Sequence, residues 1–280
     1  MTDTEYTEEE EFEGSDGETF SPLAAKMPAD SSILASARGL IGDDNSRIDS
    51  LATICLQDPV ILIELLKKAN ALFFTGGGKP ITTAKTAIVR LGSDVMREIL
   101  DSLTEREEIE DKQVRHWYDI YRSRSRRIGI VTRIFSESVN RTLSEDCQTI
   151  GSMYSIGDML AVYCFDEEYV ELAESQTRSS LNYKLATNYH FDVEKMGLSY
   201  LRRNGIPEAL LFALDRDARP REKERATMKP VCMASMELVD AFDHNKWERF
   251  APGKKLAPKS AIRMLQLSDN QYLKIYERAS

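Results

Sequence analysis

The chain has 280 residues, of which 42% are hydrophobic and 30% are charged, so it is long enough and apolar enough to bury a substantial core. No apolar run approaches the roughly 20 residues that a membrane-spanning helix needs, and no basic flank with an apolar segment marks a signal peptide, which excludes an integral membrane protein and makes the cytoplasm the expected location. Cys55, Cys147, Cys164 and Cys232 are widely spaced and form no C-x-x-C pair, so we expect reduced core residues rather than disulfides or metal ligands.

The net charge of −9 is concentrated at the N-terminus. Nine acidic residues precede the first basic residue, Lys26, and they account for the whole imbalance: Asp3, Glu5, Glu8, Glu9, Glu10, Glu11, Glu13, Asp16 and Glu18. This segment is rich in Thr, Ser and Gly and poor in apolar residues, so we expect residues 1–25 to form an acidic disordered tail. The tail is either a solubilising extension or a functional segment, which would dock a basic partner or compete for the body's own arginines.

The first elements of the body read as helices. Ser31 and Ser32 can cap a helix that ends at Gly42. Asp58 is an expected N-cap with Pro59 at the first helical position, and the apolar helix that follows is broken off by the glycines at 76–78. The next helix begins at Thr82 or Thr83 and is expected to end at Gly92.

A second group of helices follows a highly charged run at 105–112, which we expect to separate an N-terminal helical subdomain (26–108) from a C-terminal one (109–280). The long helix expected from Val114 to Asn140 places Trp117, Tyr121 and Ile128 on one apolar face. The remaining periodic segments are Ser93–Leu103, Thr149–Phe165, Asp166–Leu172, Ser179–Tyr189, Asp192–Arg203, Pro207–Arg216, Lys229–Phe242, Pro258–Gln266 and Ser268–Arg278. No segment alternates like a strand, and no hairpin turn signal is present, so the fold class is predicted to be an all-α multi-helix bundle.

Four short motifs between Gln57 and Gly92 resemble the HDOD family, the HD-related output domain. They are Gln57-Asp58-Pro59, Ala69-Asn70, Pro80-Ile81-Thr82 and Ala87-Ile88-Val89-Arg90-Leu91-Gly92. The resemblance implies an HD-domain-like helical bundle that is related to HD phosphohydrolases and serves as a regulatory output module in bacterial signalling.

The same resemblance locates the metal-ligand positions of an HD enzyme in this chain. An HD hydrolase needs His and Asp side chains from several helices that converge on metal ions. The positions implied are Arg124, Tyr154, Ser155, Val193 and Asp217, and only the last carries a metal-binding group. The chain has three histidines, His116, His190 and His244, and none forms an H-D doublet or an H-E-x-x-H motif. We therefore expect no metal, no other cofactor and no phosphohydrolase activity.

Arg124 continues the apolar face of its helix, and a buried guanidinium needs an anionic partner or several acceptors. One hypothesis is that Arg124 pairs with Asp217, Asp158 or Asp192 in a degenerate pocket; the alternative is that the helix is rotated and leaves Arg124 at the rim. An arginine-lined pocket would favour a small anionic ligand such as a nucleotide phosphate.

The preferred function is a non-catalytic signalling module that acts through contacts with unidentified protein partners or through a small ligand, without a membrane. A first alternative is a divergent metal-dependent phosphohydrolase that uses Asp217, Asp158 and a displaced His190. A second is a nucleic-acid-binding regulator, for which the arginines near Arg122 are a weak signal because the body is charge-balanced. Arg122, Arg126 and Arg133 are expected instead to form solvated ion pairs.

Overall fold

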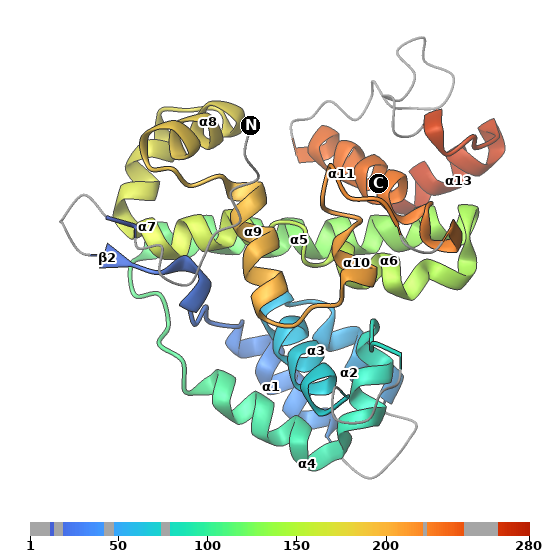
Figure 1. Cartoon of the computed structure of the whole chain (residues 1–280), viewed down its shortest axis with the longest axis horizontal. Coiled ribbons are helices and arrows are strands. Elements are labelled where there is room, and N and C mark those ends of the chain that lie inside the picture. The colour runs from blue at the N-terminus through green and yellow to red at the C-terminus, as the bar shows by residue number, and fades with distance from the viewer. Residues whose placement is uncertain (1–11, 14–18, 42–47, 74–78, 221–222, 244–262) are drawn as a thin grey trace.

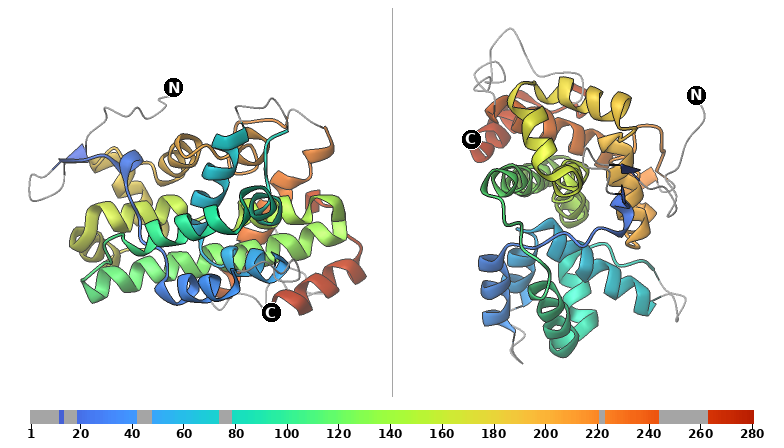
Figure 2. Two further views of the ribbon diagram at one scale, coloured as in Figure 1. Left: turned by 90° about the horizontal axis from the view of Figure 1, so that it is seen from below. Right: turned by 90° about the vertical axis from the view of Figure 1, so that its left-hand side faces the viewer.

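The computed structural model of the chain describes residues 12–13, 19–41, 48–73, 79–220, 223–243 and 263–280. Its α-helices are α1 (Ser31–Leu40), α2 (Ile48–Cys55), α3 (Pro59–Phe73), α4 (Ala84–Thr104), α5 (Lys112–Val139), α6 (Ser144–Gly151), α7 (Ile156–Glu174), α8 (Arg178–Asn188), α9 (Val193–Arg203), α10 (Glu208–Leu211), α11 (Met228–Asp243) and α13 (Asp269–Ala279). Helices α1–α4 form one group, and α5 runs through the centre of a second group that contains α6–α13 (Figures 1 and 2). The predicted all-α bundle is confirmed, while the exact division at residue 108 stays a prediction.

Short strands β1 (Phe12–Glu13) and β2 (Thr19–Phe20) pair antiparallel in front of this bundle, followed by the 3-10 helix η1 (Pro22–Ala24). Phe12 is buried, and its ring meets the Phe191 ring edge-on at a centroid distance of 5.7 Å. The expectation of a disordered tail through residue 25 is therefore wrong for the described part of that segment, because apolar side chains anchor it on the second group of helices. The other tail residues lie outside the described ranges.

Helix α3 begins as the sequence predicts, while α1 uses a different cap. The Asp58 carboxylate Oδ1 accepts from the backbone N–H groups of Val60 and Ile61, at 2.8 and 3.2 Å. Helix α1 is capped by Asp30 rather than by a serine, since the Asp30 carboxylate accepts from the backbone N–H groups of Ser32 and Ile33. The predicted stop at Gly42 and the glycine connector at 76–78 lie outside the described residues.

Asn70 explains why two of the HDOD-like motifs occur together. Its side-chain amide donates to the Leu66 and Ile81 carbonyls at 2.9 and 3.0 Å, and its carbonyl oxygen accepts from the Ile81 N–H at 2.9 Å. The buried amide therefore ties the chain that returns at Ile81 to the end of α3.

Two predicted helix boundaries appear as kinks. Gly92 has φ 72° inside α4, and Asp166 has φ 48° inside α7, so each pair of predicted helices is continuous but bent. The predicted helix Thr149–Phe165 is wrong in its middle, because α6 ends at Gly151 and α7 begins at Ile156. The α10 region is also shorter than the predicted helix Pro207–Arg216.

The two groups of helices meet at a buried ionic junction. Arg122 of α5 lies 3.2 Å from Asp30 Oδ2 (via Nη1) and 3.4 Å from Asp58 Oδ2 (via Nε). Asp58 is completely buried, and its Oδ2 also accepts from the Asp30 N–H at 2.8 Å. Tyr118 adds a hydrogen bond from its hydroxyl to the Pro28 carbonyl at 3.0 Å. Arg122 also pairs with the neighbouring acid Asp119 at 2.9 Å, as predicted, but the prediction that such pairs are solvated is wrong for Arg122, because its side chain is only 11% exposed.

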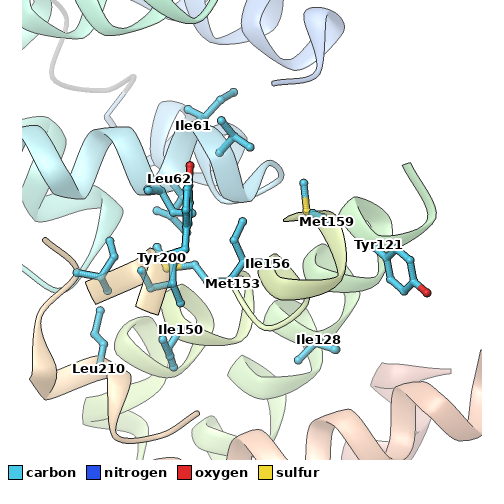
Figure 3. Packing of buried hydrophobic residues seen from close by; sticks show 14 of the residues in the cluster. Ile61, Leu62, Tyr121, Ile128, Ile150, Met153, Ile156, Met159, Tyr200 and Leu210 are labelled. Carbon is cyan, nitrogen blue, oxygen red and sulfur yellow. The ribbon is translucent and has the colours of Figure 1, made fainter. Parts of the chain in front are cut away.

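A single apolar core crosses this junction (Figure 3). Ile61 and Leu62 of α3 belong to the same buried cluster as Ile150 of α6, Ile156 of α7 and Tyr200 of α9. The continuity of this core holds α5 and α7 in fixed positions, and those helices carry the charged residues described next.

Candidate functional site

A cavity of about 1040 Å³ lies in the second group of helices. Its wall is formed by the first turns of α7 and α8, by one face of α9, by the segment after α10, and by one face of α11. Apolar side chains such as Leu198, Met233 and Met236 line part of it, and charged side chains line the rest. The volume lies at the upper end of what small-molecule sites in proteins provide.

Arg124 of α5 lies behind this wall and is held by three contacts. Its Nη2 and Nε donate to Asp240 Oδ1 on α11 at 2.6 and 3.2 Å, and its Nη1 donates to the Ser155 hydroxyl at 2.7 Å. The Arg124 side chain is 6% exposed and that of Asp240 is 35% exposed. The Tyr154 ring centroid lies 5.8 Å from the guanidinium carbon, which adds a cation–π contact.

A second arginine approaches the same carboxylate from α8. Arg178 makes a bidentate contact with Asp158 of α7, in which its Nη2 donates to Oδ2 at 2.7 Å and its Nε donates to Oδ1 at 3.2 Å. The Arg178 Nη1 lies 4.0 Å from Asp240 Oδ1. Burial by itself would lower the pKa of Arg178, but the negative charge of Asp158 and its hydrogen bonds raise the pKa above the ordinary value. We call Arg124, Asp240, Arg178 and Asp158 the ion cluster; positive and negative groups alternate along it.

Aromatic side chains form the inner side of the ion cluster. The Tyr169 hydroxyl donates to the Tyr121 hydroxyl at 2.7 Å, and the Arg178 guanidinium lies 5.9 Å from the Tyr121 ring centroid. Burial raises the pKa of Tyr121, followed by the effect of the Asp158 charge, so this phenol stays neutral. The aromatic groups therefore provide an uncharged, low-dielectric boundary that strengthens the ion pairs beside them.

Two glycines allow the cavity-forming helices to cross closely. A Cβ atom at Gly157 of α7 would lie 1.9 Å from the Val193 carbonyl oxygen of α9, and one at Gly197 would lie 2.9 Å from the Gly157 nitrogen. The absence of a side chain at these positions brings the first turn of α7 against α9 and so fixes where Asp158 and Val193 face the cavity.

Comparison with known proteins identifies the fold family. Residues 27–220 match the HDOD domain. The chain belongs to the HDOD family. Two structures of the MmoQ response regulator from Methylococcus capsulatus share the fold. One is 18% identical, with a TM-score of 0.70 over 91% of this chain and 99% of that one. The other, a fragment, is 19% identical, with a TM-score of 0.66 over 89% of this chain and 94% of that one. A virulence factor from Campylobacter jejuni is 14% identical with a TM-score of 0.66, over 92% and 96% of the two chains. No curated protein matches the chain.

The structure brings together four of the five residues that the HDOD resemblance selects. Tyr154 and Val193 line the cavity, and Arg124 and Ser155 lie hydrogen-bonded to each other just behind it. Asp217 is exposed, is not part of the cavity wall, and accepts no hydrogen bond from Arg124. Whether these residues bind a ligand remains a proposal.

The predicted partners of Arg124 are wrong. Arg124 pairs with Asp240 instead of Asp217, Asp158 or Asp192, because Asp158 is engaged by Arg178 and Asp192 caps α9. The alternative that Arg124 lies at the rim is also wrong, given its burial. The sequence did carry a signal for Asp240. It follows Cys232 and Met236 at helical spacing, which places an acid in line with apolar residues of α11.

A metal site requires grouped ligands, and a nucleic-acid surface requires a continuous basic patch. In the described part of the chain, no three His, Cys, Asp or Glu side chains are grouped so that they could hold a metal ion. Two of the arginines on α5, Arg122 and Arg124, are buried in ion pairs, and Arg127 pairs with Asp243 on α11. These arginines therefore do not present one continuous basic surface.

Among the residues described, no helix has both the length and the apolar character that crossing a lipid bilayer requires.

Proposed function

We propose that this HDOD protein is a non-catalytic regulatory module of signal transduction, located in the cytoplasm, that acts through contacts with a protein partner. The observation that carries the proposal is the identity of the groups in the former catalytic region. The HDOD resemblance places the first metal ligand of an HD enzyme at Arg124, and this guanidinium is held there by Asp240 and Ser155.

A buried guanidinium is incompatible with a metal ion at the same place, because two cations would repel each other in a low-dielectric environment. The neighbouring acid Asp158 makes a bidentate pair with Arg178 and so is already neutralised. The fold that this chain shares with the MmoQ response regulator supports a place in signalling.

The rival proposal, a divergent phosphohydrolase, needs Asp158, Asp217 and His190 to act together. Asp158 lines the cavity, whereas neither Asp217 nor His190 is part of its wall. The geometry therefore favours the regulatory module over the enzyme.

Two measurements on the purified full chain test the proposal. Elemental analysis is expected to find no near-stoichiometric Mn, Fe, Zn or Mg, and a phosphomonoester is expected to be hydrolysed no faster than in buffer. A stoichiometric metal together with hydrolysis that is lost in Asp158→Asn would overturn the non-catalytic assignment.

The signalling role is tested by the proteins that co-purify with the chain. We expect a defined signalling partner to be retained by the full chain, and a parallel purification without residues 1–20 shows whether the acidic segment contributes. Failure of any partner to bind in a reciprocal experiment with both proteins purified would contradict a role through protein contacts.

A further inference from the structure

Two guanidinium groups from different helices approach one oxygen atom at the wall of the cavity. Asp240 Oδ1 lies 2.6 Å from Arg124 Nη2 and 4.0 Å from Arg178 Nη1. Convergent guanidinium groups of this kind are a common way to bind a carboxylate or a phosphate group. In this structure the anion between them is a side chain of the protein itself.

The two acids of the ion cluster are not equally buried. Asp158 is 4% exposed and makes a bidentate pair with Arg178, so it is an integral part of the wall. Asp240 is 35% exposed, and it contacts both Arg124 and Arg178. Solvent or a ligand in the cavity can therefore reach Asp240 more easily than Asp158.

Three helices begin at the cavity wall. Helices α7, α8 and α9 all present residues of their first turn to the cavity, represented by Gly157, Ser179 and Val193. The N-terminus of a helix carries a partial positive charge and backbone N–H groups that attract anions. At α9 the Asp192 carboxylate already accepts from the N–H groups of Glu194 and Lys195, and Glu194 and Glu237 add negative charge to the wall. The two arginines therefore carry the argument.

We propose that the cavity is a receptor site for a small molecule with a carboxylate or phosphate group, and that this group takes the place of the Asp240 carboxylate between Arg124 and Arg178. This inference rests on the proposed non-catalytic function, since it requires that no metal ion occupies the region. The exchange keeps the charge balance, because one anion replaces another beside the two arginines.

The apolar residues of the cavity wall indicate what the remainder of the ligand is like. Leu198, Met233 and Met236 offer an apolar surface, and methionine side chains adapt their shape to what they contact. A ligand with an apolar or planar body of small-molecule size fits this combination. Because Asp240 links α11 to α5, its displacement would also loosen that helix contact and so couple binding to a change in the bundle.

Inorganic phosphate is the probe that tests the anion site, titrated into the full chain at constant ionic strength with EDTA present. In wild-type protein we expect millimolar phosphate, but not chloride, to raise the melting temperature. In Asp240→Asn the internal competitor is removed, so we expect phosphate to bind about tenfold more tightly. Asp243→Asn is the matched control, because Asp243 lies three residues further along α11 and pairs with Arg127 outside the cavity wall.

The proposal is overturned if Asp240→Asn and Asp243→Asn bind phosphate with the same affinity as wild type. Should Asp240→Asn fail to fold, Arg178→Gln in the otherwise unchanged chain decides the question: the phosphate effect must be lost there, and a retained effect would overturn the proposal. If phosphate binds only when a divalent metal is added, the non-catalytic function fails as well; if phosphate does not bind at all, only the receptor site fails.

Discussion

At the residue scale, the burial of Arg124 is made possible by acceptors on two sides. Asp240 accepts two of its hydrogen bonds and the Ser155 hydroxyl accepts a third. Removing the charge of one partner leaves the other groups without compensation, whereas replacing both partners by apolar groups is often tolerated. The ion pair is therefore best examined by changing one partner and then both.

We predict that Arg124→Met lowers the free energy of unfolding by about 2 kcal/mol, since Asp240 and Ser155 lose their charged donor. The double variant Arg124→Met/Asp240→Leu should recover most of that loss. Urea unfolding monitored by circular dichroism measures both free energies, with Arg127→Met as the control because the Arg127 side chain is 45% exposed. Equal losses in Arg124→Met and Arg127→Met would contradict the importance of the buried pair.

The sequence predicted the burial of Arg124 but not its partner, and the difference has a physical cause. Helical periodicity places Arg124 on the apolar face of α5, and this depends on α5 alone. The choice of Asp240 depends on how α11 packs against α5, which no local pattern specifies. The partner of Arg178 likewise depends on how α8 packs beside α7, because Arg178 pairs with Asp158 of α7.

At the element scale, the break between α6 and α7 shows a tertiary contact that overrides periodicity. The Ser155 N–H donates to the Ser125 hydroxyl of α5 at 2.9 Å instead of to a carbonyl of a continuing helix. The kinks at Gly92 and Asp166, in contrast, fall where the sequence predicts helix boundaries. Boundaries marked by a local signal could be predicted, and a boundary made by packing could not.

Glycine substitutions test whether the crossing of α7 and α9 is as close as the structure shows. We predict that Gly157→Ala costs about 3 kcal/mol of unfolding free energy, because its Cβ would meet the Val193 backbone carbonyl, which cannot move aside like a flexible side chain. Gly39→Ala in α1 should stabilise the protein by about 0.5 kcal/mol, since a Cβ there meets nothing within 4 Å and alanine favours the helix. If α7 and α9 cross as closely as the structure shows, chemical unfolding gives changes in unfolding free energy of opposite sign for the two variants.

The docking of α13 on α5 should depend on pH through Glu137. Partial burial alone would raise its pKa, but hydrogen bonds from Arg278 of α13 and Arg133 of α5 lower the pKa below the ordinary value of 4.5. A lowered folded-state pKa means that this stabilisation is present above pH 4.5 and is lost as the pH falls through the folded-state pKa.

We therefore expect Glu137→Gln to reduce stability by about 0.5 kcal/mol at neutral pH, as is usual for partly exposed pairs, and by less at acidic pH. Urea unfolding midpoints of Glu137→Gln and wild type, measured at several pH values below 6, give this difference in stability. A gap between variant and wild type that widened toward acidic pH would contradict the sign.

At the scale of the whole molecule, the two groups of helices are joined by a common apolar core and by the ionic junction at Arg122. The sequence pattern places a charged boundary between them, which predicts two subdomains, but the residues that join them are far apart in the chain. Asp58 serves at once as the N-cap of α3 and as the partner of Arg122, so the start of one helix and the contact between the two groups depend on one carboxylate. This double role makes the junction the natural place to test cooperativity.

Arg122→Gln is predicted to lower the free energy of unfolding by about 3 kcal/mol at neutral pH, because a completely buried carboxylate loses its counter-ion. Burial already raises the pKa of Asp58, and three backbone N–H groups and Arg122 oppose that increase. Without Arg122 the pKa rises further, so the folded state of the variant binds a proton more readily than the unfolded state and gains stability as the pH falls. The stability gap to wild type should therefore narrow toward acidic pH.

Urea unfolding of Arg122→Gln between neutral and acidic pH is followed by circular dichroism and by tryptophan fluorescence. It measures both the loss of unfolding free energy and the pH dependence of that loss. Arg126→Gln is the matched control on the same helix, since Arg126 is exposed and its replacement should change stability by less than about 0.5 kcal/mol. Because both tryptophans, Trp117 and Trp247, follow α4 in the chain, a separate early unfolding of α1–α4 would appear in circular dichroism before it appears in fluorescence. Coincident transitions in the variant would show that the apolar core alone couples the two groups of helices. A stability gap between variant and wild type that stayed constant at all pH values would show that Arg122 does not compensate the Asp58 charge.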